Sequence, residues 1–259
     1  MDMEALNAIN LRHYINEGTP VLLPVGSMEV HGPHLPIGTD VYIVQAICRL
    51  IAQRTTIIEM PPVWYSLTDT TNELQGTLNV PRDVVAEYVK AICLSLIENG
   101  FTRIIVLNIH GRNNLFLPAV ASEVFLETDI PVLYIDPYTC FMGDLDEAVL
   151  GKVHNHKKEA TLLLAALDIL GKKELLSLSG IETVEVEKPD SLKRLLSSGQ
   201  VGYYYNRDEQ HISPRADLSL ENGLTYLNQV ADRLVPLLSD LDAYSSYVRD
   251  NPRKRKRDL

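Results

Sequence analysis

Cysteine is scarce in this sequence, and its distribution argues against a protein held together by disulfides or by cysteine-bound zinc. Only three cysteines occur among 259 residues, and Cys48, Cys93 and Cys140 each stand alone among apolar neighbours. Isolated cysteines of this kind are typical of small buried hydrophobic side chains in a reducing compartment. The sequence therefore predicts a cytoplasmic protein without a disulfide framework.

The sequence also lacks long apolar runs and an excess of positive charge. No run approaches the roughly 18 apolar residues that cross a membrane. The start MDMEALNAIN has neither the basic nor the apolar region of a signal peptide. The net charge of −10 argues against a general nucleic-acid binder, which needs a basic surface. We expect neither a membrane nor a nucleic-acid partner.

Positive charge is concentrated at the C-terminus, where residues 251–259 read NPRKRKRDL. We expect a solvated, disordered tail there, with a targeting or anion-binding patch as the alternative. No internal repeat and no convincing linker divides the rest of the chain. The sequence therefore predicts a single domain over residues 1–250.

Short apolar runs alternate with amphipathic stretches along the chain. Runs over 21–25, 103–108 and 130–136 predict buried strands, and a weaker run lies at 55–60. Three- and four-residue apolar spacing predicts helices over 42–54, 82–99, 115–127, 159–170 and 220–239, with Thr39 or Asp40 as the N-cap of the first. Residues 171–210 are less regular. The alternation predicts an α/β fold with a parallel sheet built from βαβ units.

Three potential metal ligands follow the first predicted strand. Glu29 and His31 are two residues apart, so an extended segment directs both side chains to the same side. Asp40 follows after a Pro/Gly turn, and a carboxylate, unlike an imidazole or an amide, can bridge two cations. Alternatively, Glu29 and His31 are solvated loop residues and Asp40 only caps the next helix.

Histidines mark two further clusters. His110 follows the strand at 103–108, at the sheet edge where the first cluster is expected, and Gly111 allows a close backbone approach. The alternative is a strand-end turn with a hydrogen-bonded histidine. His154 and Glu159 stand at the start of the helix predicted over 159–170, where the helix dipole favours a carboxylate. Taken alone, this third cluster is better explained by helix capping than by chemistry.

Together these clusters resemble motifs of the creatininase (creatinine amidohydrolase) family. The run PVGSMEVHGPHLPIGTD at Pro24–Asp40 is similar to the family's opening motif, and NIHGRNN at Asn108–Asn114 resembles its N-G-H-G-G-N element. HNHKKEAT at His154–Thr161 is a degraded form of the H-A-G-E-x-E-T-S element. QGTL at Gln75–Leu78 resembles the P-G-T segment. The order of the four motifs agrees with the family over most of the chain.

The resemblance implies a three-layer αβα sandwich with a mainly parallel central sheet. It also implies a site for two divalent metal ions per chain, for which Zn, Mn and Fe all suit mixed carboxylate and imidazole ligands. It assigns Glu29, Asp40 and His110 to one ion. It assigns His31 and the bridging Asp40 to the other.

The chain departs from the family beside these ligands. Creatininase takes a further ligand from a Glu two residues beyond the position of His110, where this chain has Arg112. Glu159, which corresponds to the second Glu of the third element, then completes the second metal site. A guanidinium at this place suggests an anionic substrate, because it can grip a carboxylate or phosphate bidentately, unless Arg112 pairs with a local carboxylate.

The residues and the resemblance predict a metal-dependent amidohydrolase. We expect it to cleave a non-peptide C–N bond, in a cyclic amide or a formamide, by a metal-bridging hydroxide. His154 is the candidate proton shuttle to the leaving nitrogen. The substrate is expected to be a small molecule in contact with Arg112, Trp64, Gly76 and Thr77. Creatinine is not expected, because the family's creatinine-stacking tryptophans have no evident counterpart and Trp64 is the single tryptophan.

Other functions remain open. The resemblance also allows hydrolysis of a carbon–carbon bond in a cyclic ketone or cleavage of a short peptide on the same site. The degraded third motif is compatible with a metal-binding member that has lost activity. The family further implies a homo-oligomer, since ring-like hexamers are common in it.

Overall fold

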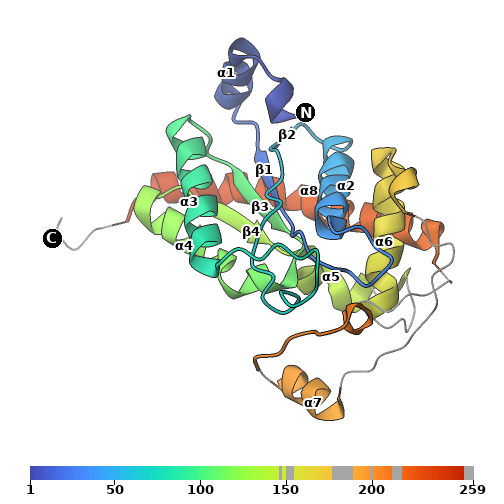
Figure 1. Cartoon of the computed structure of the whole chain (residues 1–259). Helices are drawn as coiled ribbons and strands as arrows, with labels where there is room; N and C mark the ends of the chain where they lie inside the picture. The colour runs from blue at the N-terminus through green and yellow to red at the C-terminus, as the bar shows by residue number, and fades with distance from the viewer. Residues whose placement is uncertain (146–147, 150–154, 177–188, 199–200, 212–217, 254–259) are drawn as a thin grey trace.

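The computed structural model describes residues 1–145, 148–149, 155–176, 189–198, 201–211 and 218–253 (Figure 1). Its sheet contains β1 (Val21–Val25), β2 (Ile58–Glu59), β3 (Ile104–Asn108) and β4 (Val132–Ile135). The α-helices are α1 (Ala8–Asn16), α2 (Thr39–Ala52), α3 (Arg82–Glu98), α4 (Leu117–Thr128), α5 (Pro137–Leu145), α6 (Asn155–Leu170), α7 (Asp190–Ser198) and α8 (Leu220–Asp250). Two short 3-10 helices lie near the site, η2 (Gly111–Leu115) and η5 (Asp208–Gln210).

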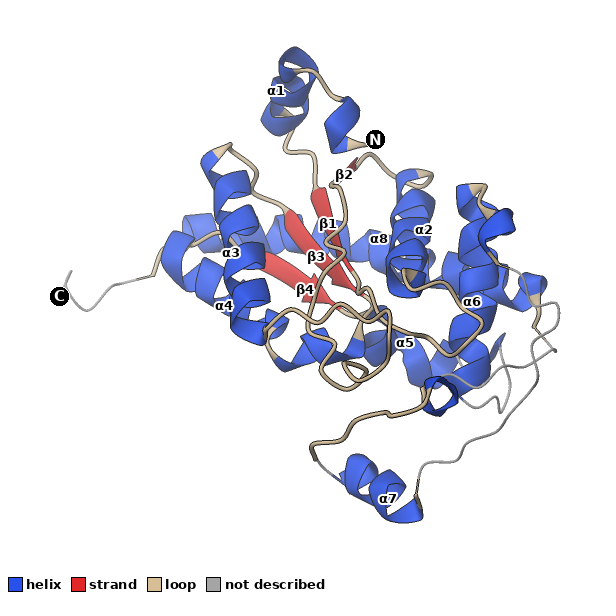
Figure 2. Cartoon of the chain, in the orientation of Figure 1, coloured by secondary structure: helices blue, strands red, loops and turns tan. Residues whose placement is uncertain are grey.

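The strands run parallel in the order β2-β1-β3-β4, with helices on both sides of the sheet (Figure 2). Every residue of β1 and of β3 is buried, which is typical of strands covered by helices on both faces. The predicted α/β fold, a three-layer sandwich around a mainly parallel sheet, is confirmed.

Alternate strand residues build two separate cores. On one face the strands pack against α3 and α4 in a cluster that includes Val21, Leu23, Ile104, Val106, Val89 and Val124. On the other face α2, α6 and α8 cover a cluster that includes Leu22, Ile105, Leu107, Ile47, Leu163 and Leu227. Successive strand residues point to opposite faces, so the same short run fills both cores. The division into one domain over 1–250 stays a prediction.

The strand order creates a crevice between the ends of β1 and β3. The chain leaves β1 toward β2 through α2, which packs on one face of the sheet. It leaves β3 toward β4 through α4, which packs on the other face. Open α/β sheets bind ligands where neighbouring strands send their connections to opposite faces. The candidate ligands after β1 and after β3 therefore meet at the expected place.

Several details differ from the sequence prediction. The N-cap of α2 is Gly38, because the Thr39 hydroxyl donates to the Pro36 carbonyl and the Asp40 carboxylate turns into the site. Helix α8 continues past Pro236 and well beyond residue 239. A proline inside a helix costs about 3 kcal/mol, which the packing of α8 against α2 and α6 offsets. Residues 190–198, within the stretch predicted to be irregular, form α7.

The terminal and cysteine predictions have mixed outcomes. Cys48 and Cys93 are buried free thiols as predicted, whereas Cys140 is exposed.

At the C-terminus, Arg253 donates to the Asp129 carboxylate and to the Leu126 carbonyl. The rest of the basic tail, residues 254–259, lies outside the described residues. No helix in the described part of the chain has the length and apolarity to span a membrane.

Gly223 lets α8 approach α6 closely. A Cβ atom there would lie 2.5 Å from the Thr161 carbonyl oxygen and 2.8 Å from the Ala165 Cβ. Alanine would gain about 1 kcal/mol in helix propensity. Overpacking a well-filled core costs about 1–3 kcal/mol, so we expect Gly223→Ala to lower the free energy of unfolding despite that gain. Urea denaturation measures the change.

The matched control is Gly202→Ala, because no atom lies within 4 Å of a Cβ built there. We expect this variant to stay within about 0.5 kcal/mol of the wild type. A Gly223→Ala protein as stable as the wild type would contradict the close helix contact.

Glu59 is a buried carboxyl group at the end of β2, and its Oε2 has no hydrogen-bond partner among the described residues. Burial raises its pKa to about 7. The unfolded chain therefore releases this proton at lower pH than the folded protein, and stability falls between about pH 4 and pH 7, by up to about 3 kcal/mol. We expect Glu59→Gln to match the wild type at pH 4 and to exceed it above pH 7, as measured by urea unfolding across this range.

Glu98→Gln, at an exposed residue, is the control and should show no such pH-dependent gain. A stability difference between Glu59→Gln and the wild type that is the same at every pH would contradict the raised pKa of Glu59.

Candidate metal centre

The carboxyl ends of β1 and β3 open into a cavity of about 580 Å³. Its walls come from the loop after β1, the end of β3 with η2, the start of α5 with the residue before it, helices α6 and α7, and residues 201–211. The candidate ligands Glu29, His31, Asp40 and His110 are buried together in it, with exposures of 3%, 1%, 3% and 4%. Buried charged groups require partners of opposite charge.

Asp40 uses its two carboxylate oxygens on different partners. Oδ1 lies 3.2 Å from His31 Nε2, and Oδ2 lies 3.0 Å from His110 Nδ1. The Ser27 hydroxyl donates to Oδ2 at 2.7 Å and so fixes the rotation of the carboxylate. The two histidines face opposite oxygens of one carboxylate, which is the arrangement that a bridge between two cations requires.

Glu29 divides its oxygens between the histidines and a hydroxyl group. Oε1 lies 3.1 Å from His110 Nδ1 and 3.8 Å from His31 Nε2. The Thr71 hydroxyl donates to Oε2 at 2.6 Å. The side chain therefore has a fixed orientation, with one oxygen directed at the histidines.

Three histidines place one ring nitrogen against a backbone carbonyl. His31 Nδ1 lies 3.0 Å from the Glu29 carbonyl, and His110 Nε2 lies 2.7 Å from that of Leu67. His211 Nδ1 contacts the carbonyl of Val30. A carbonyl oxygen only accepts, so each of these nitrogens carries the proton, and the other ring nitrogen of a neutral imidazole keeps its lone pair. Metal-binding histidines typically have this arrangement.

The electrostatics favour cations in the cavity. Burial by itself raises the pKa of Asp40 and of Glu29, but the histidines hold the pKa of Asp40 well below its usual range and lower that of Glu29 to about 2. Burial lowers the pKa of His31, but Asp40 and Glu29 raise it to about 10. The same carboxylates raise the pKa of His110 well above its usual value. Protons on the imidazoles therefore balance the carboxylates in this arrangement.

The residues fit a pair of divalent ions, which can take the place of those protons. Two groups of candidate ligands have atoms that all lie within 4.8 Å of one another. The first is Glu29, Asp40 and His110, and the second is Glu29, His31 and His211. Zn, Mn and Fe all suit these mixed oxygen and nitrogen ligands.

The third predicted cluster is only partly described. Glu159 lines the same cavity, but among the described residues it joins neither group of close ligand atoms. Burial raises the pKa of Glu159 to about 7, with Asp40 and Glu29 adding to the rise and His31 opposing it. Its Oε2 has no hydrogen-bond partner in the described part of the chain. His154 lies outside the described residues. Both roles stay predictions.

Arg112 lines the cavity, but Asp69 already occupies its guanidinium. Nε donates to Asp69 Oδ1 and an Nη nitrogen donates to Asp69 Oδ2, both at 2.6 Å. Pairing of Arg112 with a nearby carboxylate was the alternative in the sequence analysis. This pairing removes most of the argument for an anionic substrate.

The structure does not bring the other predicted substrate residues to the cavity. Trp64 stacks edge-on against Tyr42 and lines a separate apolar cavity. Gly76 packs against Ile37, and the Thr77 hydroxyl accepts a hydrogen bond from the Val30 amide at 3.1 Å. Gly76 and Thr77 therefore support the loop that carries Glu29 and His31, and they do not line the site.

Sequence reasoning missed Ser27, Thr71 and His211. Ser27 lies within the opening motif, where its place between Gly26 and Glu29 gives no sign of its bond to Asp40. Thr71 lies 42 residues from its partner Glu29, and His211 lies 181 residues from its partner Val30. Spacing along the sequence therefore gives no sign of either contact. The sequence around His211 offers one weak signal, since several tyrosines precede this histidine.

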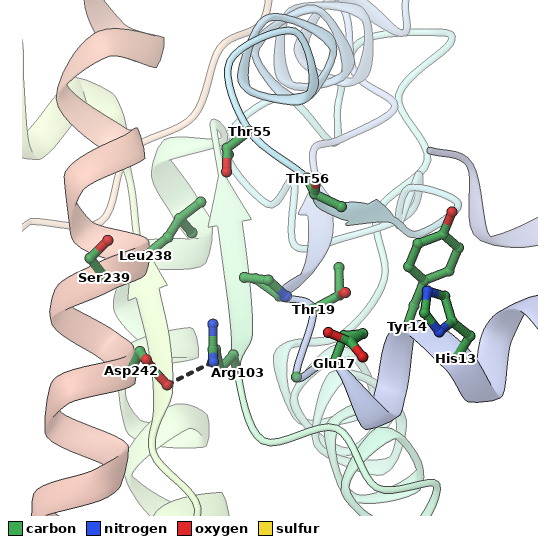
Figure 3. Close-up of a pocket in the computed structure, with 12 residues that line it drawn as sticks. His13, Tyr14, Glu17, Thr19, Thr55, Thr56, Arg103, Leu238, Ser239 and Asp242 are labelled. Carbon is green, nitrogen blue, oxygen red and sulfur yellow. Dashed lines mark ion pairs between the residues drawn. The ribbon is translucent and has the colours of Figure 1, made fainter.

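A second cavity, of about 460 Å³, lies at the amino ends of β1 and β3 (Figure 3). Arg103 and Asp242 form an ion pair of 2.9 Å in it, and Figure 3 shows Thr19 and Thr56 nearby. Among the described residues, its lining supplies no group of close metal ligands. Amino ends of parallel strands are also not where such sheets bind ligands. The cavity at the carboxyl ends of the strands is therefore the candidate metal centre.

Comparisons with known proteins bear on the family and the fold of the chain. A family model described as creatininase, creatinine amidohydrolase, matches residues 4–237. The chain is 27% identical over 128 residues to a 3-dehydro-scyllo-inosose hydrolase of Thermotoga maritima, covering 49% of this chain and 40% of that protein. It is 28% identical over 102 residues to a creatinine amidohydrolase of Pseudomonas putida, covering 38% and 39%.

A third relative is a mycofactocin precursor peptide peptidase of Mycolicibacterium smegmatis, 34% identical over 119 residues, covering 41% of this chain and 44% of that protein. The aligned regions thus span about two fifths of the length of these relatives. A solved creatininase with manganese matches with a TM-score of 0.72 at 18% identity, covering 97% of this chain and 99% of that chain. A mutant creatininase of the Zn–Zn type matches with a TM-score of 0.72 at 18% identity, covering 97% and 98%.

Ser27 provides a test of the site that leaves the candidate ligands in place. Ser27→Ala removes the 2.7 Å hydrogen bond that orients Asp40. Loss of a partner behind a metal ligand typically weakens metal binding about 10–100-fold, and we expect that loss here. Competition with a chromophoric chelator measures the affinity.

Ser66→Ala is the matched control, because the buried Ser66 hydroxyl donates to the Gly26 carbonyl and not to a candidate ligand. It should cost stability, about 1 kcal/mol, without changing metal affinity. Equal metal affinities for Ser27→Ala and the wild type would show that Asp40 does not bind metal in this orientation.

Proposed function

Because the chain belongs to the creatininase family, we propose that it is a hydrolase with two divalent metal ions that cleaves a non-peptide C–N bond in a small cyclic amide or formamide. The observation that carries this proposal is the position of Asp40. Each of its oxygens faces a different buried histidine, at 3.2 Å and 3.0 Å. A single metal ion would not require both oxygens to be directed in this way.

We assign the ligands by combining this geometry with the family resemblance. Glu29, Asp40 and His110 would hold one ion, and their ligand atoms lie within 4.8 Å of one another. His31 and Asp40 would hold the other, with Glu159 as a further ligand from the same cavity. The similar solved creatininases include manganese and zinc forms, which supports these metals for the present chain.

When bound, two divalent ions supply an activated water and polarise the substrate carbonyl. The chain's own residues provide the order that this chemistry needs. Ser27 and Thr71 fix the carboxylates of Asp40 and Glu29, and burial keeps bulk water from both. We propose that His154 carries a proton to the leaving nitrogen, because an imidazole takes and gives a proton near neutral pH.

The cavity supports a small, neutral substrate. Its volume of about 580 Å³ lies in the range of small-molecule sites. The bidentate contact of Arg112 with Asp69 leaves little uncompensated positive charge for an anionic group. The names of the relatives cover an inosose, creatinine and a precursor peptide, so a carbon–carbon bond and a short peptide remain the alternatives to a cyclic amide.

We further propose a cytoplasmic homo-oligomer, with a hexamer as the arrangement that the resemblance suggests. The free thiols Cys48, Cys93 and Cys140 support a reducing compartment. Exposed apolar side chains next to the cavity of Trp64 support a contact with a second copy of the chain. They are Tyr65, Val84 and Tyr88.

Metal content tests the two-metal site directly. We expect the gently purified protein to contain about two ions per chain, by inductively coupled plasma mass spectrometry. Asp40→Asn should contain fewer than about one, because a bridging carboxylate serves both ions. Asp83→Asn, at an exposed residue that starts α3, is the matched control and should keep both. A wild type with less than about one ion, or an Asp40→Asn variant with two, would overturn the proposal.

The reaction class needs a substrate screen of the metal-loaded protein. Turnover of a lactam or a formamide that a chelator abolishes and added metal restores would support C–N hydrolysis. Turnover of cyclic ketones alone or of short peptides alone would move the assignment to those reactions. Full metal content without turnover of any of these would favour a metal-binding protein that has lost activity.

A further inference from the structure

His211 reaches the metal centre from a segment that the family motifs do not include. Figure 1 shows residues 201–211, in orange, on the side of the molecule toward which the strands point. The His211 ring lies 5.0 Å from the His31 ring and 5.2 Å from the Tyr205 ring, measured between centroids. Its ligand atom falls within 4.8 Å of those of Glu29 and His31.

Contacts of Tyr205 hold this segment against the rest of the protein, and a turn within the segment presents His211. The Tyr205 amide donates to the Thr70 carbonyl at 2.7 Å, and the Tyr205 ring is buried with Val30 and Leu74. Helix η5 then ends next to His211, and its Gln210 side chain accepts hydrogen bonds from two backbone amides at the start of the turn, those of Asn206 and Arg207. The histidine is thus presented by an ordered turn with contacts at both of its ends.

The orientation of the His211 ring matches that of His31. Nδ1 of His211 donates to the Val30 carbonyl, as Nδ1 of His31 does to the carbonyl of Glu29. In each case the carbonyl accepts from the protonated Nδ1, so Nε2 carries the lone pair through which a neutral imidazole binds a metal. Val30 lies between Glu29 and His31, so the same short stretch of backbone orients both rings.

We propose that His211 is a ligand of the second metal ion, the ion that His31 binds. This inference rests on the two-metal function proposed above and changes its ligand set. Glu159 lines the cavity but lies outside both groups of close ligand atoms among the described residues, whereas His211 belongs to one. Glu29 belongs to both groups of candidate ligands.

The ligand type has a consequence for metal choice. Imidazole suits zinc, whereas carboxylate oxygens suit manganese better. A second site with His31 and His211 therefore favours zinc over manganese more strongly than a site completed by Glu159 would. Replacing His211 by a carboxylate should shift that preference toward manganese.

The variant His211→Asn tests whether His211 binds a metal ion or only holds its segment in place through Val30. The asparagine amide can still donate to the Val30 carbonyl from the position of Nδ1, but it has no nitrogen at the position of Nε2. Metal-free protein is titrated with zinc in competition with a chromophoric chelator. We expect the first ion to bind as in the wild type and the second to bind at least about 100-fold more weakly. His13→Asn, at an exposed histidine of α1, is the control and should bind both ions normally.

The outcomes separate this inference from the proposed function. A wild type with two ions and a His211→Asn variant with unchanged affinity for both would overturn the ligand role and leave the two-metal function intact. Loss of the second ion in Glu159→Gln but not in His211→Asn would assign the position to Glu159. A wild type with less than about one ion would overturn the function itself.

His211→Glu, whose longer side chain brings a carboxylate oxygen to the position of Nε2, keeps the test decisive where His211→Asn fails to fold without metal. We expect it to bind the second ion again, with the ratio of zinc to manganese affinity lowered at least about 10-fold relative to the wild type. Circular dichroism of the metal-free proteins shows whether each variant is folded. A folded His211→Glu variant with an unchanged affinity ratio would contradict a direct ligand.

Discussion

The need to compensate the buried carboxylate of Asp40 governs the site around it. Asp40 is 3% exposed and lies close to Glu29, which is equally buried. Removing ionised carboxylates from water costs several kcal/mol each unless cations or strong hydrogen bonds replace the water. His31 and His110 supply the opposite charge, and the Ser27 hydroxyl supplies a hydrogen bond. Metal ions meet the same requirement with higher charge, which is why the arrangement suits them.

The sheet makes this concentration of charge possible. Parallel strands end at one edge, and β1 and β3 send their connections to opposite faces, which leaves a crevice between their ends. The two apolar cores occupy the body of the sandwich, so the polar side chains can gather only beyond the last buried strand residues. Val25 and Asn108 are paired in register at this edge, and the Glu29 and His110 side chains follow within a few residues.

Much of the fold and half of the centre could be predicted from the sequence. Glu29, His31 and His110 follow apolar runs directly, so their place at the sheet edge follows from strand geometry. The sequence did not reveal partners that come from afar. Asp69 pairs with Arg112 across 43 positions, and Val30 orients His211 across 181. Trp64 is predicted to contact the substrate, whereas in the structure it packs against Tyr42 and lines another cavity.

The order in which the two groups of ligands occur along the chain bears on how the protein is made. Glu29, Asp40 and His110 all lie in the first 110 residues, whereas the group with His211 spans residues 29 to 211. A ribosome therefore delivers the first group long before the second, and contacts between such distant residues form late in folding. With His211 as a ligand, the first ion's predicted ligands Glu29, Asp40 and His110 are synthesised before the ligands of the second ion are complete. The second could be captured only by a nearly finished protein, so full metal loading would report that the chain has completed its fold.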